Sequence, residues 1–235
     1  MKRLYVYACS YGKFGHVCQP PSALGAPVSS NPKPCPICSQ YPDIANESWV
    51  DNRSFPQLMA NDLGLDLVNR SFPGASNYKL FTFFLDDLPQ MDFGDMVFFQ
   101  WTHINRAWYA KDPRRSVMVH NHPEFEGIAN FYYEHFYDDR QSLSQLIGLS
   151  MYVKHRTPGK YYFGTADPYD TFNNIDSLLC ADLYNMEECI NPKKANVIMD
   201  ILNQYNTTKF HCGHPNEYGH QRVAEEYLKN IRELK

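Results

Sequence analysis

An almost unbroken apolar run at residues 95–101 most constrains the fold of this chain. It reads Asp-Met-Val-Phe-Phe-Gln-Trp. A strand with apolar side chains on both of its faces is typical of the centre of a parallel sheet that helices cover on both sides. The run therefore predicts an α/β protein built around a parallel sheet.

The rest of the chain alternates between strand and helix patterns around this run. Residues 3–9 and 65–69 predict two strands before it, and residues 161–164 predict one after it. Helical periodicity predicts helices at residues 55–64, 78–88, 125–153 (one long helix or two shorter ones), 175–183 and 196–205. In the third of these, we expect Phe136 and Leu143 to face inwards. This βαβα order predicts a doubly wound parallel sheet.

The size and composition of the chain fit one globular domain that spans residues 1–235. Of its 235 residues, 43% are hydrophobic and 15% are aromatic, which is enough for a full core. The formal net charge of −4 argues against a nucleic-acid-binding surface. No apolar run reaches the roughly 20 residues of a membrane span, and the apolar N-terminal stretch is too short for a signal peptide. We expect no nucleic-acid or membrane partner and synthesis in the cytoplasm, and the oligomeric state stays open.

Residues 13–47 form a Pro- and Cys-rich insertion that interrupts the alternation. Its prolines exclude long regular elements, so an ordered insertion needs a cross-link of its own. Cys35 and Cys38 have the two-residue spacing that lets both thiolates bind one tetrahedral zinc ion, and His16 and Cys18 complete the best ligand set. Free thiols or a disulfide fit the same pattern. The insertion therefore predicts a structural zinc site, with these alternatives open.

Polar residues follow each of the first three predicted strands, where open α/β sheets place their ligands. Ser10 follows the first strand, and a turn at residues 73–77 that contains Gly74 follows the second. A polar cluster that begins at Thr102 follows the third strand. Backbone amides beside Gly74, at the start of a helix, can meet an anion. Each position on its own equally fits an ordinary turn.

Residues 213–220, Gly-His-Pro-Asn-Glu-Tyr-Gly-His, precede the last predicted helix. Asn216 is a candidate N-cap of that helix. Its apolar residues recur at helical spacing: Val223, Tyr227, Ile231 and Leu234. A histidine held at a helix entrance has the fixed position that a general base requires, which makes His214 a candidate base. A turn histidine that only caps the helix is the alternative.

These pieces, in this order and together with the Ser-Phe-Pro-Gln-Leu-Met-Ala segment at residues 54–60, resemble the SGNH (GDSL-type) hydrolases. The resemblance is to divergent members of the kind found in phage genomes. It implies a flavodoxin-like three-layer α/β/α sandwich with a central parallel sheet. It also implies hydrolysis of esters by a serine nucleophile, with no cofactor for catalysis.

The resemblance assigns roles to individual residues. Ser10 matches the nucleophile, His214 the catalytic histidine, and Gly74 the glycine whose amide forms the oxyanion hole with that of Ser10. Thr102, Asn77 or Asn105 would supply a further oxyanion donor, since the family's third-block asparagine has no clear counterpart. The first block reads Ala-Cys-Ser instead of Gly-Asp-Ser, and His211 stands where the family has the acid that orients the histidine.

We therefore expect a serine esterase that removes O-acyl groups from a carbohydrate or a similar polar small molecule. Aromatic residues such as Trp101, Trp108 and Tyr109 suit a sugar ring, although core packing explains them equally well. The altered first block and His211 favour an alternative, in which the chain is a binding module that keeps the fold and has lost efficient chemistry.

Overall fold

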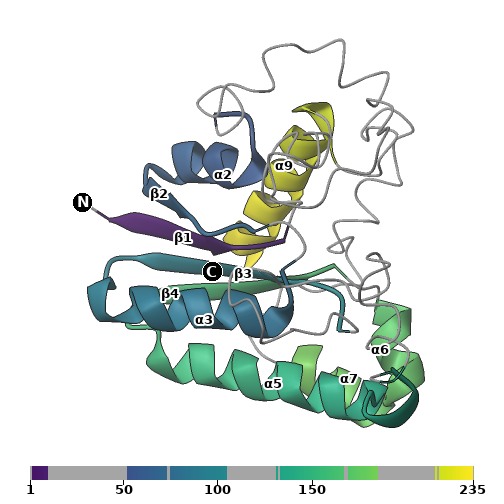
Figure 1. Cartoon of the computed structure of the whole chain (residues 1–235). Helices are drawn as coiled ribbons and strands as arrows, with labels where there is room; N and C mark the ends of the chain where they lie inside the picture. Colours follow the sequence, from purple (N-terminus) through teal and green to yellow (C-terminus); the bar gives the residue numbers. More distant parts are fainter. Residues whose placement is uncertain are drawn as a thin grey trace, which may run out of the picture.

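Four parallel strands form one sheet in the order β2-β1-β3-β4 (Figure 1). The computed structural model describes residues 2–9, 52–72, 75–104, 131, 133–166, 169–184, 215 and 217–234. The strands are β1 (Arg3–Tyr7), β2 (Asp66–Asn69), β3 (Met96–Trp101) and β4 (Lys160–Thr165). The apolar run lies at the centre of the sheet as strand β3, and all four predicted strands are confirmed.

Helices lie on both sides of this sheet. They are α2 (Phe55–Leu63), α3 (Asn77–Asp87), α5 (Asp139–Arg156), α6 (Tyr169–Ile175), α7 (Ser177–Tyr184) and α9 (Glu217–Glu233), with a short 3₁₀ turn, η6 (Leu88–Gln90). Gly64 ends α2 in the left-handed conformation, with φ 66°. The hydroxyl of Ser76 caps α3 by accepting a hydrogen bond from the amide of Lys79 at 3.2 Å.

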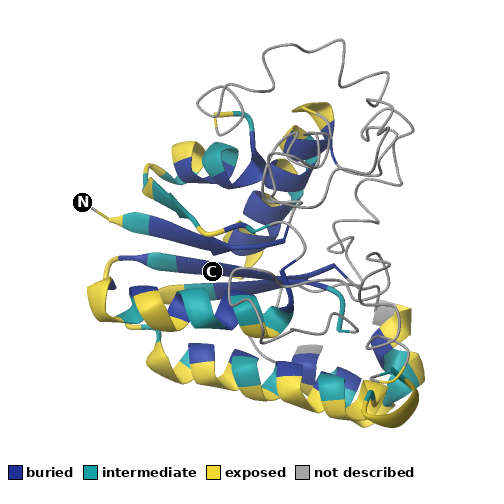
Figure 2. Ribbon diagram, viewed as in Figure 1, coloured by how far each residue is buried: buried dark blue, intermediate teal, exposed yellow. Residues whose placement is uncertain are grey.

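The core consists of two apolar layers, one on each face of the sheet (Figure 2). Alternate residues of β1 divide between them, so that Leu4 and Val6 pack in the layer with α2 and α9. Tyr5 and Tyr7 pack in the layer with α3, α5, α6 and α7. The predicted three-layer α/β/α sandwich is confirmed.

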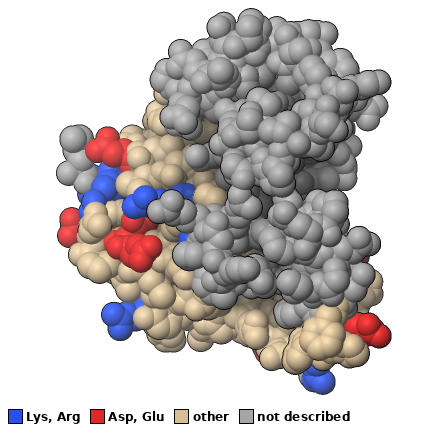
Figure 3. Space-filling view, in the orientation of Figure 1, with Lys and Arg blue, Asp and Glu red and all other residues tan. Residues whose placement is uncertain are grey.

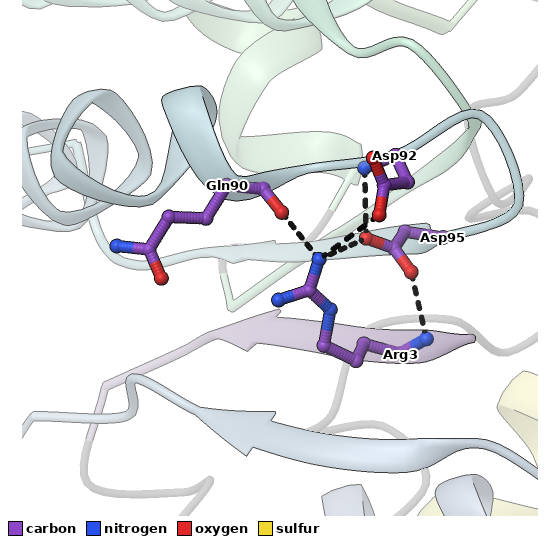
Figure 4. A network of polar contacts seen from close by, with 4 residues as sticks. All are labelled: Arg3, Gln90, Asp92 and Asp95. Atoms are coloured by element: carbon purple, nitrogen blue, oxygen red, sulfur yellow. Dashed lines mark hydrogen bonds and ion pairs between the residues drawn. The ribbon is translucent and has the colours of Figure 1, made fainter. Parts of the chain in front are cut away.

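A polar network closes the amino end of the sheet (Figure 4). The carboxylate of Asp95, which is 3% exposed, accepts hydrogen bonds from the Arg3 amide (2.8 Å), the Arg3 guanidinium (3.0 Å) and the Asp92 amide (2.9 Å). Burial opposes ionisation of Asp95, but these hydrogen bonds and the Arg3 charge outweigh it and lower the pKa of Asp95. The Arg3 guanidinium also donates to the carbonyl of Gln90. Figure 3 shows acidic and basic groups side by side over this end of the molecule.

The entry to β4 is packed tightly against the same network. A Cβ on Gly159 would lie 2.0 Å from the carbonyl oxygen of Asp95, a distance that no side chain tolerates. That carbonyl accepts the amide of Lys160 at 3.1 Å, which starts the pairing of β4 with β3. Only glycine therefore fits at position 159.

Three details differ from the sequence-based expectations. Phe136 is 63% exposed because it lies in a turn before α5, and Leu234 is 42% exposed because α9 ends at Glu233; both were expected to face inwards. Leu143 is buried, as predicted. Helix α6 was not anticipated, and the predicted helix at residues 196–205 lies outside the described residues. None of the described helices is both long and apolar enough to cross a membrane.

Candidate active site

The winding of the sheet reverses between β1 and β3. Strand β2 follows β1 in the chain and lies at one edge of the sheet, beside β1. Strand β4 follows β3 in the chain and lies at the opposite edge, beside β3. In open α/β sheets, ligands bind at such a switch point, in the crevice outside the carboxyl ends of the strands. We therefore expect a ligand-binding site at the carboxyl ends of β1 and β3.

Backbone pairing continues past the formal ends of the strands at this edge. The Arg70 amide donates to the Val6 carbonyl at 2.8 Å, and the Phe72 amide donates to the Ala8 carbonyl at 2.9 Å. Beyond β4, the Ala166 amide donates to the Trp101 carbonyl at 2.7 Å. The segments that leave β1 and β2 are thereby held side by side, and so are the ends of β3 and β4.

The side chain of Asn77 holds the residue that follows β3. Its Oδ1 accepts a hydrogen bond from the Thr102 amide at 2.7 Å, and its Nδ2 donates to the Thr102 carbonyl at 3.1 Å. Pairing of β1 with β3 ends at Tyr7 and Phe99. A carboxamide presents one acceptor and one donor side by side, as a strand backbone does, so Asn77 continues the ladder where β1 has ended.

Three consecutive residues at the end of β3 bury polar side-chain atoms. Gln100 and Trp101 are 0% exposed and Thr102 is 1% exposed. Both carboxamide atoms of Gln100, the indole nitrogen of Trp101 and the hydroxyl of Thr102 have no hydrogen-bond partner in the structure as described. The buried hydroxyl of Ser71, which follows β2, also has no hydrogen-bond partner in the structure as described. Buried polar atoms are nearly always paired in folded proteins, so we expect a water molecule or a ligand to pair with these atoms.

The predicted site residues divide into two groups. Thr102 and Asn77 lie at the switch point, in contact with each other. The others lie outside the described residues: Ser10, Gly74, Asn105, His211 and His214, and the predicted zinc ligands His16, Cys18, Cys35 and Cys38. Among the residues that are described, no cluster of His, Cys, Asp and Glu side chains could hold a metal ion.

The described neighbours of the three main candidates are all buried at the ends of core elements. Cys9 precedes Ser10 and follows β1, and Ala75 follows Gly74 just before α3. Pro215, which follows His214, is also buried.

His220 is a buried histidine that the sequence analysis did not single out as a site residue. It is 0% exposed, and its Nδ1 accepts a hydrogen bond from the Phe55 amide at 3.1 Å. The Phe55 ring stacks on the imidazole, with 6.1 Å between ring centroids. His220 therefore joins the start of α9 to the start of α2, which fixes the helix that follows the candidate base.

Trp101 is part of the core. Its ring stacks on Phe99 at 4.4 Å and on Phe163 at 6.0 Å between centroids. Of the two interpretations of Trp101, core packing is the correct one, and Trp108 and Tyr109 lie outside the described residues.

Comparison with known proteins identifies the fold. The chain is similar to the psychrotrophic esterase EstA from Pseudoalteromonas sp., crystallised with monoethylphosphonate as inhibitor, with a TM-score of 0.50 and 9% identity over 99% of this chain and 98% of that chain. The chain shares the α/β fold of this esterase. A second structure, a member of the lipolytic protein G-D-S-L family from Veillonella parvula, gives a TM-score of 0.46 and 12% identity over 97% of both chains. Neither a protein-family model nor the sequence of a curated protein matches this chain.

Proposed function

We propose that this protein is a serine hydrolase that cleaves esters, with Ser10 as nucleophile and His214 as general base. The observation that carries the proposal is the buried hydroxyl of Thr102 at the switch point, on a backbone that Asn77 clamps. A fixed donor without a partner is the kind of group that stabilises an oxyanion. The fold, shared with a phosphonate-inhibited esterase, agrees with this reaction class.

In this reaction, the Ser10 hydroxyl attacks the ester carbonyl carbon while His214 takes its proton. The tetrahedral intermediate collapses, the alcohol leaves with the proton from His214, and water then cleaves the acyl-serine by the same two steps. The amides of Ser10 and Gly74 would donate to the oxyanion, because preorganised donors stabilise the charge that develops there.

Thr102 would join this oxyanion hole through its hydroxyl. Its own amide is already used, since it donates to Asn77 Oδ1 at 2.7 Å. One N–H of the Asn77 carboxamide is likewise used on the Thr102 carbonyl, and the other N–H is left to donate. Thr102 and Asn77 together therefore replace the donor that the family carries on its third-block asparagine.

The histidine at position 211 determines how fast we expect ester hydrolysis to be. A histidine in the place of the orienting acid supplies no fixed negative charge, and loss of that charge costs on the order of 10⁴-fold in serine proteases. We propose that the pair works as a dyad, with a backbone carbonyl holding His214. Hydrolysis is therefore slow compared with that of an enzyme with a complete triad.

The substrate class and the metal rest on the sequence alone. We propose O-acyl groups on a carbohydrate or a similar polar molecule as the substrate, since Trp108 and Tyr109 suit a sugar ring. We also propose a structural zinc ion on His16, Cys18, Cys35 and Cys38. A purified protein with no zinc and freely titratable thiols would exclude that site.

The function is tested with a small activated acetyl ester. Ser10→Ala and His214→Ala should each abolish turnover, and the double variant should be little worse because the two residues act as one unit. His211→Asp should raise the rate, since it restores the orienting charge. Unchanged activity in Ser10→Ala would exclude the serine mechanism. If neither the wild-type protein nor His211→Asp turns over ester, the binding module replaces the esterase as the better account.

A further inference from the structure

Gln100 is the most unusual polar residue in the described core. It lies on the central strand β3, it is 0% exposed, and neither Oε1 nor Nε2 has a hydrogen-bond partner in the described structure. Side chains alternate along a strand, so Gln100 shares with Phe98 the face that packs against α2 and α9. An unpaired buried carboxamide destabilises a fold, which calls for a partner at this position.

A second unpaired polar group lies on the same side of the sheet. Gln100 pairs with Gly164 of β4, and a Cβ on Gly164 would lie 3.3 Å from the Tyr227 hydroxyl oxygen. Tyr227, on α9, is 0% exposed, and its hydroxyl has no partner among the residues described. Burial raises the pKa of Tyr227, so this hydroxyl stays protonated and can both donate and accept.

The spacing of the two groups fits one small bridging molecule. Neighbouring strands lie about 4.8 Å apart, so a hydroxyl above Gly164 is about one strand spacing from the base of the Gln100 side chain. Gly164, beside Gln100 on β4, has no side chain, and the Phe98 ring and the Tyr227 hydroxyl lie over it, each 3.3 Å from the position of a Cβ on that glycine. A buried water needs two to four polar partners, and a carboxamide with a hydroxyl supplies them.

We propose that Gln100 and Tyr227 hold one ordered water molecule between β3, β4 and α9, directly behind the carboxyl edge of the sheet. The water accepts from Gln100 Nε2 or donates to Oε1, and it exchanges a second hydrogen bond with the Tyr227 hydroxyl. It satisfies both side chains at once.

This water site also acts on the reaction, a step that rests on the proposed function. It joins β3, which leads into Thr102, to α9, which begins three residues after His214. Gln100 is thus a positioning residue: it touches no substrate, and it fixes the distance between the strand that carries the oxyanion donor and the helix that follows the base.

A double-mutant cycle on melting temperature tests the water site without any assay of activity. Gln100→Met and Tyr227→Phe should each lower the melting temperature, and the double variant should melt no lower than the worse single variant, because the shared water is already lost. Ser150→Ala is the matched control. It removes another buried hydroxyl that has no partner in the described structure, on α5 in the opposite layer, and its effect should add to that of Gln100→Met.

Additive effects of Gln100→Met and Tyr227→Phe would overturn the proposal. A higher melting temperature in Gln100→Met would also overturn it, because it would mean that the carboxamide has no partner to lose. A crystal structure of the wild-type protein with electron density for water between the two side chains would support it directly.

Ester turnover then tests the link to the site. Gln100→Met and Tyr227→Phe should lower kcat by the same factor, about tenfold, with KM unchanged, since a 1 Å misplacement can cost roughly 10²-fold. Ser150→Ala should leave kcat unchanged. Wild-type kcat in both variants would overturn the positioning role. Absence of turnover in the wild-type protein would instead contradict the proposed function, and the melting cycle would still decide the water site.

Discussion

At the amino end of β3, the carboxylate of Asp95 accepts three hydrogen bonds, whereas at the carboxyl end three consecutive residues bury polar atoms without partners in the described structure. Both ends are equally buried, with Asp95 at 3% exposure and Gln100 and Thr102 at 0% and 1%. The two ends differ in whether their buried polar groups have hydrogen-bond partners. Proteins break the rule of paired buried polar groups mainly at functional sites, so we expect the amino end to serve stability and the carboxyl end to serve the proposed chemistry.

Among changes at the described residues, the largest effect is expected from Thr102→Val. Loss of one oxyanion donor should lower kcat by about 10²–10³-fold. The melting temperature should not fall, because the Thr102 hydroxyl has no partner in the described structure to lose. Steady-state kinetics beside thermal unfolding checks both statements. Thr102→Ser, which keeps a hydroxyl, should retain most of the rate, and equal rates in the two variants would refute the donor role.

Gly159→Ala should show the opposite profile at the amino end. The added methyl would lie 2.0 Å from the Asp95 carbonyl oxygen, so the entry to β4 must shift, at a cost of about 3 kcal/mol in the free energy of unfolding. Gly148→Ala is the matched control. No heavy atom lies within 4 Å of its added Cβ, and a helical alanine should stabilise α5 by roughly 0.5–1 kcal/mol. Urea unfolding measures the change in the free energy of unfolding of both variants. An equal loss of stability in Gly148→Ala would contradict the prediction that the close contact at position 159 is the cause.

Asp95→Asn should destabilise the protein by about 2 kcal/mol, because both carboxylate oxygens accept hydrogen bonds and the amide nitrogen that replaces one of them cannot accept. The activity of the folded protein should not change. Asp92→Asn is the control, since the Asp92 side chain is 86% exposed and lies 3.7 Å from the Arg3 guanidinium; it should shift stability by less than about 0.5 kcal/mol. A fall in kcat in Asp95→Asn, measured below its melting temperature, would contradict the division of roles.

Acid should weaken the amino end in a predictable pH range. The pKa of Asp95 is lowered in the folded protein, so its contribution is complete above the unfolded pKa near 3.8 and is lost as the pH falls through the folded pKa. Between about pH 5 and pH 2, the free energy of unfolding should therefore fall less steeply in Asp95→Asn than in the wild-type protein. Parallel curves over that range would show that Asp95 does not carry this acid sensitivity.

The sequence predicts the sheet well because β3 is apolar on both faces and its neighbours are bounded by turns. The end of α2 follows in the same way from Gly64, which adopts the left-handed conformation there. Helix α6 could not be predicted from hydrophobic periodicity because it is short and packs mainly through Phe172. Periodicity gives the inward face of a helix but not the residue where the helix stops, which explains the exposure of Phe136 and Leu234.

The candidate site is predicted in part. The position of Thr102 after a central strand is visible in the sequence, since strand ends gather at one edge of a parallel sheet. Its pairing with Asn77 is not visible, because it depends on how the start of α3 meets the end of β3 in space. The unpaired state of Gln100 is hidden for the same reason: a glutamine inside an apolar run shows that it is buried, not what surrounds it.

The central place of β1 has a consequence for how the chain folds. Leu4 pairs with Leu67 on one side and with Met96 on the other, so its partners lie 63 and 92 residues further along the chain. At the usual 5–20 residues per second of synthesis, the second partner is made about 5–18 seconds after the first strand. Until then this apolar strand has at least one open edge, and parallel pairing over such separations is slow. Newly made chains should therefore depend on chaperones and low temperature for a good yield of soluble protein.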